Sequence, residues 1–246
     1  RLLIDLHQKD PATPLYEAAD ICIVGAGAAG LCLARRLLQR GNKIVLLESG
    51  GIDYEPEIAA LNAGDIRGLP YYALEDSRLR FFGGTAAIWG GRCAELDDID
   101  FEFRDWVPHS GWPFGKATLA AYYAEARRQL NLSDRALDAR LWREFGVEPP
   151  RFGEGVLSTV FWQFDDHWDR FGYAANRDLL DHPDVTVLLH ASVTNIHLNE
   201  AGSAADSVEL GSLNGCRGRI QAKAFVLAAG GLENPRLLLA SRARQS

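Results

Sequence analysis

The spacing of apolar residues changes along the chain, and the first clear pattern lies between residues 20 and 48. A short apolar run over 21–24 is followed by a helical repeat over 28–39 and by a second apolar run over 43–48. Gly41 stands where a helix commonly ends. A strand, a helix and a strand in this order predict a βαβ unit, whose parallel strands require a right-handed crossover.

From residue 185 the apolar residues follow the period of β-strands. Asn214 and Gly215 form a strong hairpin signal between the last two of these runs. The predicted strands cover residues 185–190, 192–199, 206–212 and 218–231. Together they indicate a β-meander that follows the βαβ unit.

The last strand ends in "AFVLAAGG" (224–231), which reads as a buried strand leading into small residues. One interpretation is a core strand that ends in a turn. The other is that the strand returns the chain to the first sheet, with its small residues at the carboxyl end, where ligands bind in open α/β sheets. A helix is predicted over 234–241, with Pro235 in its first turn.

The middle of the chain has a weaker pattern. Residues 52–80 are irregular and polar, and residues 131–182 indicate short helices and aromatic loops. Between them an amphipathic helix is predicted, with one face formed by Leu119, Tyr122, Tyr123, Ala126 and Leu130. The whole pattern predicts an α/β protein with a parallel central sheet plus a β-meander.

Composition narrows the possible functions. The 246 residues are 47% apolar and 24% charged, which is typical of a globular protein, and the net charge of −7 argues against nucleic acid or an anionic membrane as partner. No apolar run reaches the length of a membrane span. We expect a cytoplasmic protein, and the lack of methionine leads us to expect a part of a longer chain.

The four cysteines show no metal-binding spacing, so no metal site is predicted. Cys93 and Cys216 lie far apart in the sequence, and no CxxC pair is present. Cys22 and Cys32 fall within the βαβ unit, where small buried apolar residues are the simpler interpretation.

The turn between the first strand and its helix carries the strongest chemical signal. It reads Gly25-Ala26-Gly27-Ala28-Ala29-Gly30, a G-x-G-x-x-G motif in the strand–turn–helix context that binds dinucleotides. The phosphates of such a ligand lie at the N-terminus of the helix. Glu48, at the end of the second strand, is placed to hold ribose hydroxyls and disfavours a 2′-phosphate by its charge. FAD and NAD both remain compatible with this unit.

A second glycine-rich segment, "GGTAAIWGGR" (83–92), has two glycine pairs on either side of a tryptophan. Its backbone N–H groups could line a phosphate or a ring. An NAD-dependent dehydrogenase would leave this segment unexplained.

Taken together, four segments resemble the glucose–methanol–choline (GMC) family of FAD-dependent oxidoreductases. They are "IVGAGAAG", "IVLLESG", "FFGGTAAIWGGR" and "VLAAGGLENPRLLLAS", and they occur in the order that the family has. "WVPHSGWPF" (106–114) is similar to a stretch of the bacterial branch of that family. The resemblance implies the N-terminal, FAD-binding half, a Rossmann-like FAD-binding domain with part of a substrate domain.

The resemblance also implies which residues contact FAD. Gly25, Gly27 and Gly30 would contact the diphosphate, with Ala28 and Ala29 in the same motif, and Glu48 would contact the adenosine ribose. The residues implied to lie towards the flavin are Gly83, Gly84, Thr85, Trp89, Gly90 and Gly91. The residue implied near the adenine is Val193, and those implied beside the diphosphate are Ala229 and Gly230.

Two departures from the family pattern change what is expected. Some relatives have a histidine just before the tryptophan, covalently linked to the flavin, whereas this chain has Ile88, which implies non-covalent FAD. The family's catalytic histidine lies in a C-terminal half that this chain does not contain. The catalytic residues are therefore unknown, and none of the family's catalytic positions is matched by His7, His109, His167, His182, His190 or His197.

Several other residues have a structural and a functional interpretation. His190 and His197 are expected to be structural, and His167 to be exposed. His109 could lie at the rim of an active site or pack within its loop. Trp106 and Trp112 could stack on a sugar, although packing in a core or an interface is simpler. The acidic residues Asp97, Asp98, Asp100 and Glu102 fit no calcium loop and suggest a solvated turn.

The expected organisation is an FAD-binding segment over 1–100, a partial substrate or cap region over 101–182 and a second FAD-binding segment over 183–246. The expected function is oxidation of the CH–OH group of a small alcohol or sugar, with this chain alone inactive. The alternative is a non-catalytic FAD-binding subunit or pseudoenzyme that acts in assembly. The substrate, the electron acceptor, the choice between oxidase and dehydrogenase and the oligomeric state are left open.

Overall fold

The computed structural model describes residues 2–152, 157 and 159–243. The chain divides into two compact units. The first consists of Arg1–Ile88 and Asp169–Ser246, and the second of Trp89–Trp168. The predicted FAD-binding segments, 1–100 and 183–246, include terminal residues that lie outside the described ones. The assignment of the predicted segments to FAD binding and to the substrate stays a prediction.

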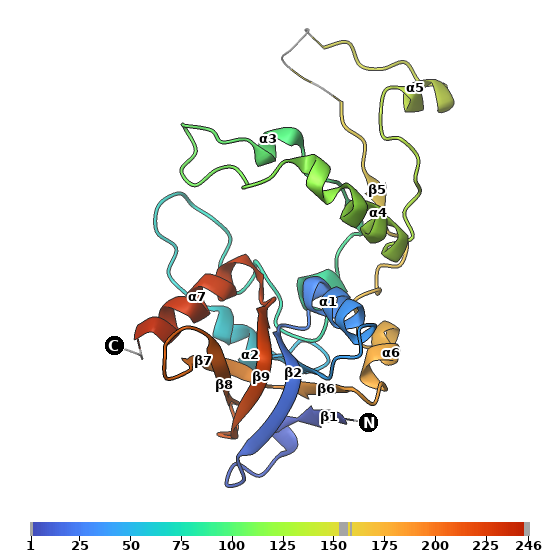
Figure 1. The fold of residues 1–246 in the computed structure, drawn as a ribbon. Coiled ribbons are helices and arrows are strands. Elements are labelled where there is room, and N and C mark those ends of the chain that lie inside the picture. The colour runs from blue at the N-terminus through green and yellow to red at the C-terminus, as the bar shows by residue number, and fades with distance from the viewer. Residues whose placement is uncertain (1, 153–156, 158, 244–246) are drawn as a thin grey trace. The chain divides into compact units, whose positions relative to one another are not determined.

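One mixed sheet of seven strands organises the first unit. Figure 1 shows how its strands and helices are arranged. Its order is β1-β6-β3-β2-β9-β8-β7, in which the first five strands are parallel and β8 and β7 are antiparallel to their neighbours. The strands are β1 (Leu2–Asp5), β2 (Leu15–Val24), β3 (Ile44–Leu47), β6 (Val185–Leu189), β7 (Ser192–Leu198), β8 (Ala205–Gly211) and β9 (Arg217–Leu227). The predicted α/β class, with a parallel centre and a meander, is confirmed.

Strand β9 joins the meander to the parallel part of the sheet. Its first half pairs antiparallel with β8, from Arg217 to Gln221. From Gly218 onwards it pairs parallel with β2, as far as Val24 opposite Leu227. The predicted return of the chain to the first sheet is therefore confirmed. The prediction that this segment is buried is wrong: Phe225 and Val226 are half-buried, because the described elements cover the faces of β9 only in part.

The βαβ unit forms as predicted, with differences at its ends. Helix α1 (Ala28–Leu38) connects β2 to β3, and Gly41 follows it with a φ of 78° and donates its N–H to the Leu38 carbonyl. Strand β2 begins at Leu15, earlier than predicted, because polar and exposed residues interrupt its first half and mask the apolar pattern. The four residues of β1 are too few to give a signal of their own.

Helix α7 (Gly230–Ala243) corrects the prediction for the end of the chain. It begins four residues before the predicted start, so Pro235 lies inside the helix and not in its first turn. The Asn234 side chain accepts a hydrogen bond from Ala229 N–H and donates one to the Leu227 carbonyl. These bonds join the helix start to the end of β9. The helix packs against β7, where Ile196 N–H donates to the Ser241 hydroxyl.

The main apolar core is formed by residues of the sheet, among them Leu188, Val208 and Ile220, together with Leu237 of α7. Cys22 is fully buried there, and burial raises the pKa of its thiol to about 12. Cys32 is half-buried, and burial raises its thiol pKa as well. Cys22, Cys32 and Cys216 are free thiols. The remaining elements of this unit are short: η1 (Leu6–Gln8), α2 (Pro56–Ala59), η2 (Ala60–Asn62), η3 (Gly84–Ala87), η5 (Ala174–Asn176) and α6 (Arg177–Leu180).

The second unit has little regular structure. Its elements are the antiparallel pair β4 (Arg92–Cys93) and β5 (Gln163–Phe164), with α3 (Asp98–Phe101), η4 (Lys116–Leu119), α4 (Ala120–Gln129) and α5 (Arg140–Glu144). The predicted amphipathic helix is present as α4, but its apolar face is not buried among the described residues: Tyr122 is 70% exposed. Among the described helices, none combines the length and the apolar character that a membrane crossing needs.

Candidate cofactor site

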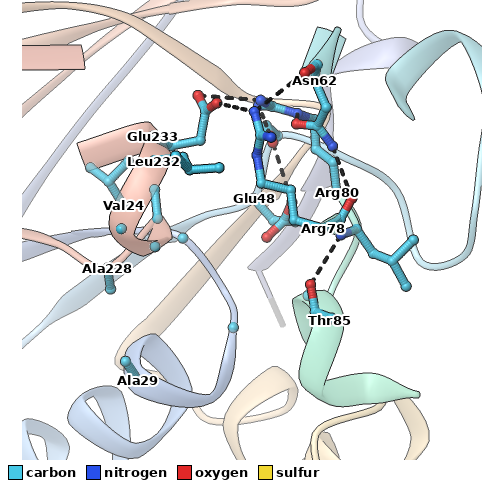
Figure 2. A pocket seen from close by; sticks show the side chains of 18 of the residues that line it. Val24, Ala29, Glu48, Asn62, Arg78, Arg80, Thr85, Ala228, Leu232 and Glu233 are labelled. Carbon is cyan, nitrogen blue, oxygen red and sulfur yellow. Dashed lines mark hydrogen bonds and ion pairs between the residues drawn. The ribbon is translucent and has the colours of Figure 1, made fainter. Parts of the chain in front are cut away.

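The carboxyl ends of three neighbouring parallel strands meet at one cavity of about 640 Å³ in the first unit. The turn after β2 contributes Gly25 and Gly27, the residue after β3 is Glu48, and the segment after β9 begins at Ala228. Figure 2 shows Val24, Ala29, Glu48 and Ala228 around this cavity, together with Arg78, Arg80, Thr85 and Glu233, which also line it. A cavity at this edge of a doubly wound sheet is the usual place for a ligand.

Two glycines of the fingerprint are required by close backbone approaches. Gly25 has a φ of 106°, and a Cβ there would lie 2.6 Å from the Ala228 carbonyl oxygen. A Cβ on Gly30 would collide with the Gly25 carbonyl oxygen. These glycines therefore allow α1 to pack against the turn and the turn to pack against the end of β9. Gly25 and Gly30 are thus required for packing within the protein itself.

Gly27 differs from Gly25 and Gly30 because a side chain at this position would meet open space. Its backbone is extended, and a Cβ would find only the Gly83 carbonyl oxygen, at 3.9 Å. Helix α1 starts at the next residue, so its first N–H groups lie at the cavity. Gly230 and Gly231 also have no atom within 4 Å of such a Cβ, and they begin α7. Two helix N-termini thus contribute to one cavity, an arrangement that favours anions.

The second glycine-rich segment lies directly beside the first. Gly83 forms a parallel bridge with Gly27, and its N–H donates to the Ala26 carbonyl at 2.9 Å. A Cβ on Gly83, whose φ is 93°, would collide with the Phe171 carbonyl oxygen. The Thr85 hydroxyl accepts the Leu79 N–H at 3.0 Å. This segment and the fingerprint therefore form one continuous wall.

Glu48 is 6% exposed and holds the turns together. Its carboxylate accepts the N–H of Ala26 at 3.1 Å and that of Gly50 at 3.0 Å. Burial raises the pKa of Glu48, against the opposing effect of these hydrogen bonds and of nearby Arg80. The side chain also lines the cavity. Each carboxylate oxygen has a second lone pair, so the residue can accept hydroxyl groups as well.

A group of arginines around Glu233, which the sequence analysis missed, forms another side of the cavity. The Glu233 carboxylate lies 2.8 Å from Arg78, 3.3 Å from Arg80 and 2.7 Å from Arg236. Arg80 also donates to the Asn62 side chain at 3.1 Å. Although burial opposes the effect, hydrogen bonds from Arg236 and Arg78 and the charge of Arg80 hold the pKa of Glu233 below its usual value.

Three guanidinium groups around one carboxylate leave this side of the cavity positive, in a chain whose net charge is −7. The available signal was "SRLR" (77–80), two arginines immediately before the glycine-rich segment. Their partner lies more than 150 residues away, in α7. Sequence spacing could not show that pairing.

The structure brings together eleven of the fifteen predicted cofactor residues. Those that line the cavity are Gly25, Gly27, Ala28, Ala29, Glu48, Gly83, Gly84, Thr85, Val193, Ala229 and Gly230. Gly30 packs behind the turn. The other three residues, Trp89, Gly90 and Gly91, belong to the second unit. The cavity is lined by residues of the first unit, so these three are not among its lining residues.

The other candidate residues are placed as follows. His109 is exposed, with a φ of 60°, so packing within its loop is not seen. Trp106 is 74% exposed, whereas Trp112 packs on Phe114 with ring centroids 5.5 Å apart. His167 is exposed, as expected. Asp98 and Asp100 lie in the short helix α3, which Asp97 and Glu102 flank, and Asp97 N–H donates to the carboxylate of Asp100.

The comparisons with known proteins agree with this geometry. The family model described as FAD dependent oxidoreductase matches residues 20–244, so the chain belongs to that family. It is 24% identical to 2-methyl-1,2-propanediol dehydrogenase of Mycolicibacterium austroafricanum, over 93% of this chain and 52% of that protein. It is 25% identical to oxygen-dependent choline dehydrogenase of Acinetobacter baumannii (strain AYE), over 92% and 50%.

Among solved structures, pyridoxine 4-oxidase from Mesorbium loti is similar in fold, with a TM-score of 0.58 and 23% identity over 89% of this chain and 51% of that one. The relatives are GMC enzymes, which confirms the family resemblance and FAD as the cofactor. The chain spans about half the length of the curated relatives it matches.

The charge pattern around Glu233 predicts a pH-dependent contribution to stability. Replacing Glu233 with Gln should lower the free energy of unfolding of the apoprotein by about 1–3 kcal/mol at pH 7, because the half-buried guanidinium groups of Arg78 and Arg80 lose a charged partner. Since the folded-state pKa is lowered, this contribution is present above the ordinary value of 4.5 and is lost as the pH falls through the folded-state pKa.

Urea unfolding of Glu233→Gln and wild type between pH 3.5 and 8 measures the difference. Glu200→Gln, an exposed site, is the matched control and should follow the wild type throughout. A difference between Glu233→Gln and wild type that stays constant down to pH 3.5 would contradict the prediction.

Proposed function

We propose that the cavity is the FAD site of an enzyme that oxidises the CH–OH group of a small alcohol or sugar. The observation that carries this proposal is the meeting of Gly27, Glu48, Gly83 and Ala229 at the carboxyl ends of parallel strands, next to a positive wall. The volume lies in the range of cofactor pockets. The residues present therefore fit a bound dinucleotide.

Each part of the cavity suits one part of FAD. The open backbone at Gly27 and the two helix N-termini suit the diphosphate, and Arg78 and Arg80 offer positive charge to the same two phosphates. Glu48 is the acceptor for ribose hydroxyls, with Val193 near the adenine. Gly83, Gly84 and Thr85 lead towards the flavin, where we also assign Trp89, Gly90 and Gly91.

FAD, when bound, supplies a hydride acceptor at flavin N5, and the protein supplies binding and orientation. An alcohol must also lose its hydroxyl proton to a base. We assign that base to the region of the relatives that this chain does not match, because none of its histidines lines the cavity. The names of the relatives, which mention a diol and choline, support a small hydroxylated substrate.

Replacing Gly27 with Val tests the FAD site directly. The extended backbone at Gly27 (φ −77°, ψ −176°) accepts a side chain, and the added atoms would project into the open part of the cradle. We expect the affinity for FAD to fall at least about tenfold, which corresponds to roughly 1.4 kcal/mol, while the melting temperature of the apoprotein changes little. Titration with FAD, followed by flavin fluorescence, measures the affinity.

Gly115→Val is the matched control, because Gly115 also precedes a helical turn with an extended backbone and open space. This variant should bind FAD as the wild type does. Equal FAD affinity in Gly27→Val and Gly115→Val would remove the cavity as the cofactor site.

A second prediction concerns turnover. If the base lies outside the matched half, the 246-residue chain loaded with FAD should oxidise neither alcohols nor sugars, although it binds the cofactor. Reduction of an artificial electron acceptor with primary alcohols, diols and aldoses measures this. Steady turnover by this chain alone would show that the base lies within it.

A third prediction concerns how FAD is held. Ile88 has no nucleophilic nitrogen, so FAD should be bound without a covalent link. Acid precipitation of the loaded protein should release all of the flavin into the supernatant. Flavin absorbance that stays with the precipitated chain would contradict non-covalent binding.

A further inference from the structure

Behind the Glu48 side of the cavity, a buried histidine lies between two carboxylates. Nδ1 of His190 is 2.6 Å from an Asp5 oxygen, and Nε2 is 2.8 Å from a Glu55 oxygen. The His190 side chain is only 7% exposed. The three residues come from the end of β1, the segment before α2 and the residue after β6, so the contact joins three distant parts of the chain.

This geometry determines the protonation of the ring. A neutral imidazole has one N–H donor and one lone pair, so it can donate to only one of the two carboxylates. At the other, a nitrogen lone pair would face oxygen lone pairs at hydrogen-bond distance. When both carboxyl groups are ionised, both contacts are favourable only if His190 carries two protons and a positive charge. Against the effect of burial, hydrogen bonds from the ring to Asp5 and Glu55 raise the pKa of His190.

The third neighbour, His7, stacks on His190 with ring centroids 3.7 Å apart and planes 8° from parallel. The titratable groups that face His190 among the described residues are thus Asp5, His7 and Glu55. His7, Glu55 and His190 also have ligand atoms close enough together to suggest a metal site. Parallel stacked rings direct their lone pairs along separate planes, however, whereas a zinc ion needs nitrogens converging at about 2.0–2.1 Å.

The backbone of His190 connects this group to the cavity wall. Its N–H donates to the Gly50 carbonyl at 2.9 Å, and the next residue, Ala191, donates to the Glu48 carbonyl at 2.8 Å. His190 has a φ of 51°, a left-handed conformation that the surrounding contacts must maintain. Glu48, Ser49 and Ala191 all line the cavity. A change in the His190 contacts would therefore alter the positions of the residues that we assign to the adenosine end of FAD.

We propose that His190, protonated on both ring nitrogens and bound to Asp5 and Glu55, is a pH-sensitive positioning residue that holds the Glu48–Gly51 turn in the shape that binds FAD. This inference rests on the proposed function. The positive charge is present at pH below the ordinary histidine value of about 6.5 and is lost as the pH rises through the raised pKa of His190. FAD binding should therefore weaken on the alkaline side.

The test is the dissociation constant of FAD measured between pH 6 and 9 with the full chain. In the wild type, FAD should bind at least about fivefold more weakly above the ionisation of His190 than below it, the lower end of usual coupling between two sites. His190→Gln should remove this step. Glu55→Gln should keep the step but move its midpoint to lower pH, because one of the two stabilising charges is gone.

His167→Gln is the matched control, since this histidine is exposed in the second unit. Its pH profile should equal that of the wild type. If His190→Gln does not fold, Glu55→Gln still decides the matter, because an unchanged midpoint overturns the proposal. A step that persists in His190→Gln also overturns it.

Two further outcomes separate the possible failures. FAD that does not bind at any pH would refute the proposed function. FAD that binds tightly but independently of pH would refute only the role of His190. Stabilisation of the wild type, but not of His7→Gln, by Zn²⁺ alone at pH 7.5 would overturn the proposal in favour of a metal site.

Discussion

Parallel pairing of β2 with β3 on one side and with β9 on the other is the constraint on which the rest of the structure depends. Because parallel strands end at the same edge of a sheet, this pairing collects the fingerprint turn, Glu48 and the start of α7. Residues from opposite ends of the chain thereby form one cavity. The meander of β7, β8 and β9 brings the chain back into this position.

The close contacts at this edge explain why its glycines have different roles. Gly25, Gly30 and Gly83 allow backbones to approach one another, so a side chain at any of them would disturb the fold. Gly27 and Gly231 have free space instead, so a side chain there would occupy the cavity, whereas Gly230 has free space but a φ of 88° that favours glycine. A glycine-rich motif thus contains both packing positions and ligand positions. Sequence spacing alone does not separate them.

Electrostatics adds a second layer to the same site. Arg78 and Arg80 hold Glu233 and leave an excess of positive charge, while His190 holds two carboxylates behind the Glu48 side of the cavity. Both groups join segments far apart in sequence, and both contain buried charges that need their partners. The cavity therefore depends on charge pairing as well as on the sheet, which makes its shape sensitive to pH.

The sequence by itself determined the βαβ unit, the meander and the family, because local periodicity and short motifs encode them. The return of β9 was one of two interpretations that the sequence allowed, and the pairing with β2 decided it. The sequence did not determine that α7 begins at Gly230 with Pro235 inside it, since Asn234 joins that helix to β9 through tertiary hydrogen bonds. Only the tertiary structure placed Arg78 beside Glu233 and His190 between Asp5 and Glu55. Such pairings depend on how distant segments pack, and no local pattern records them.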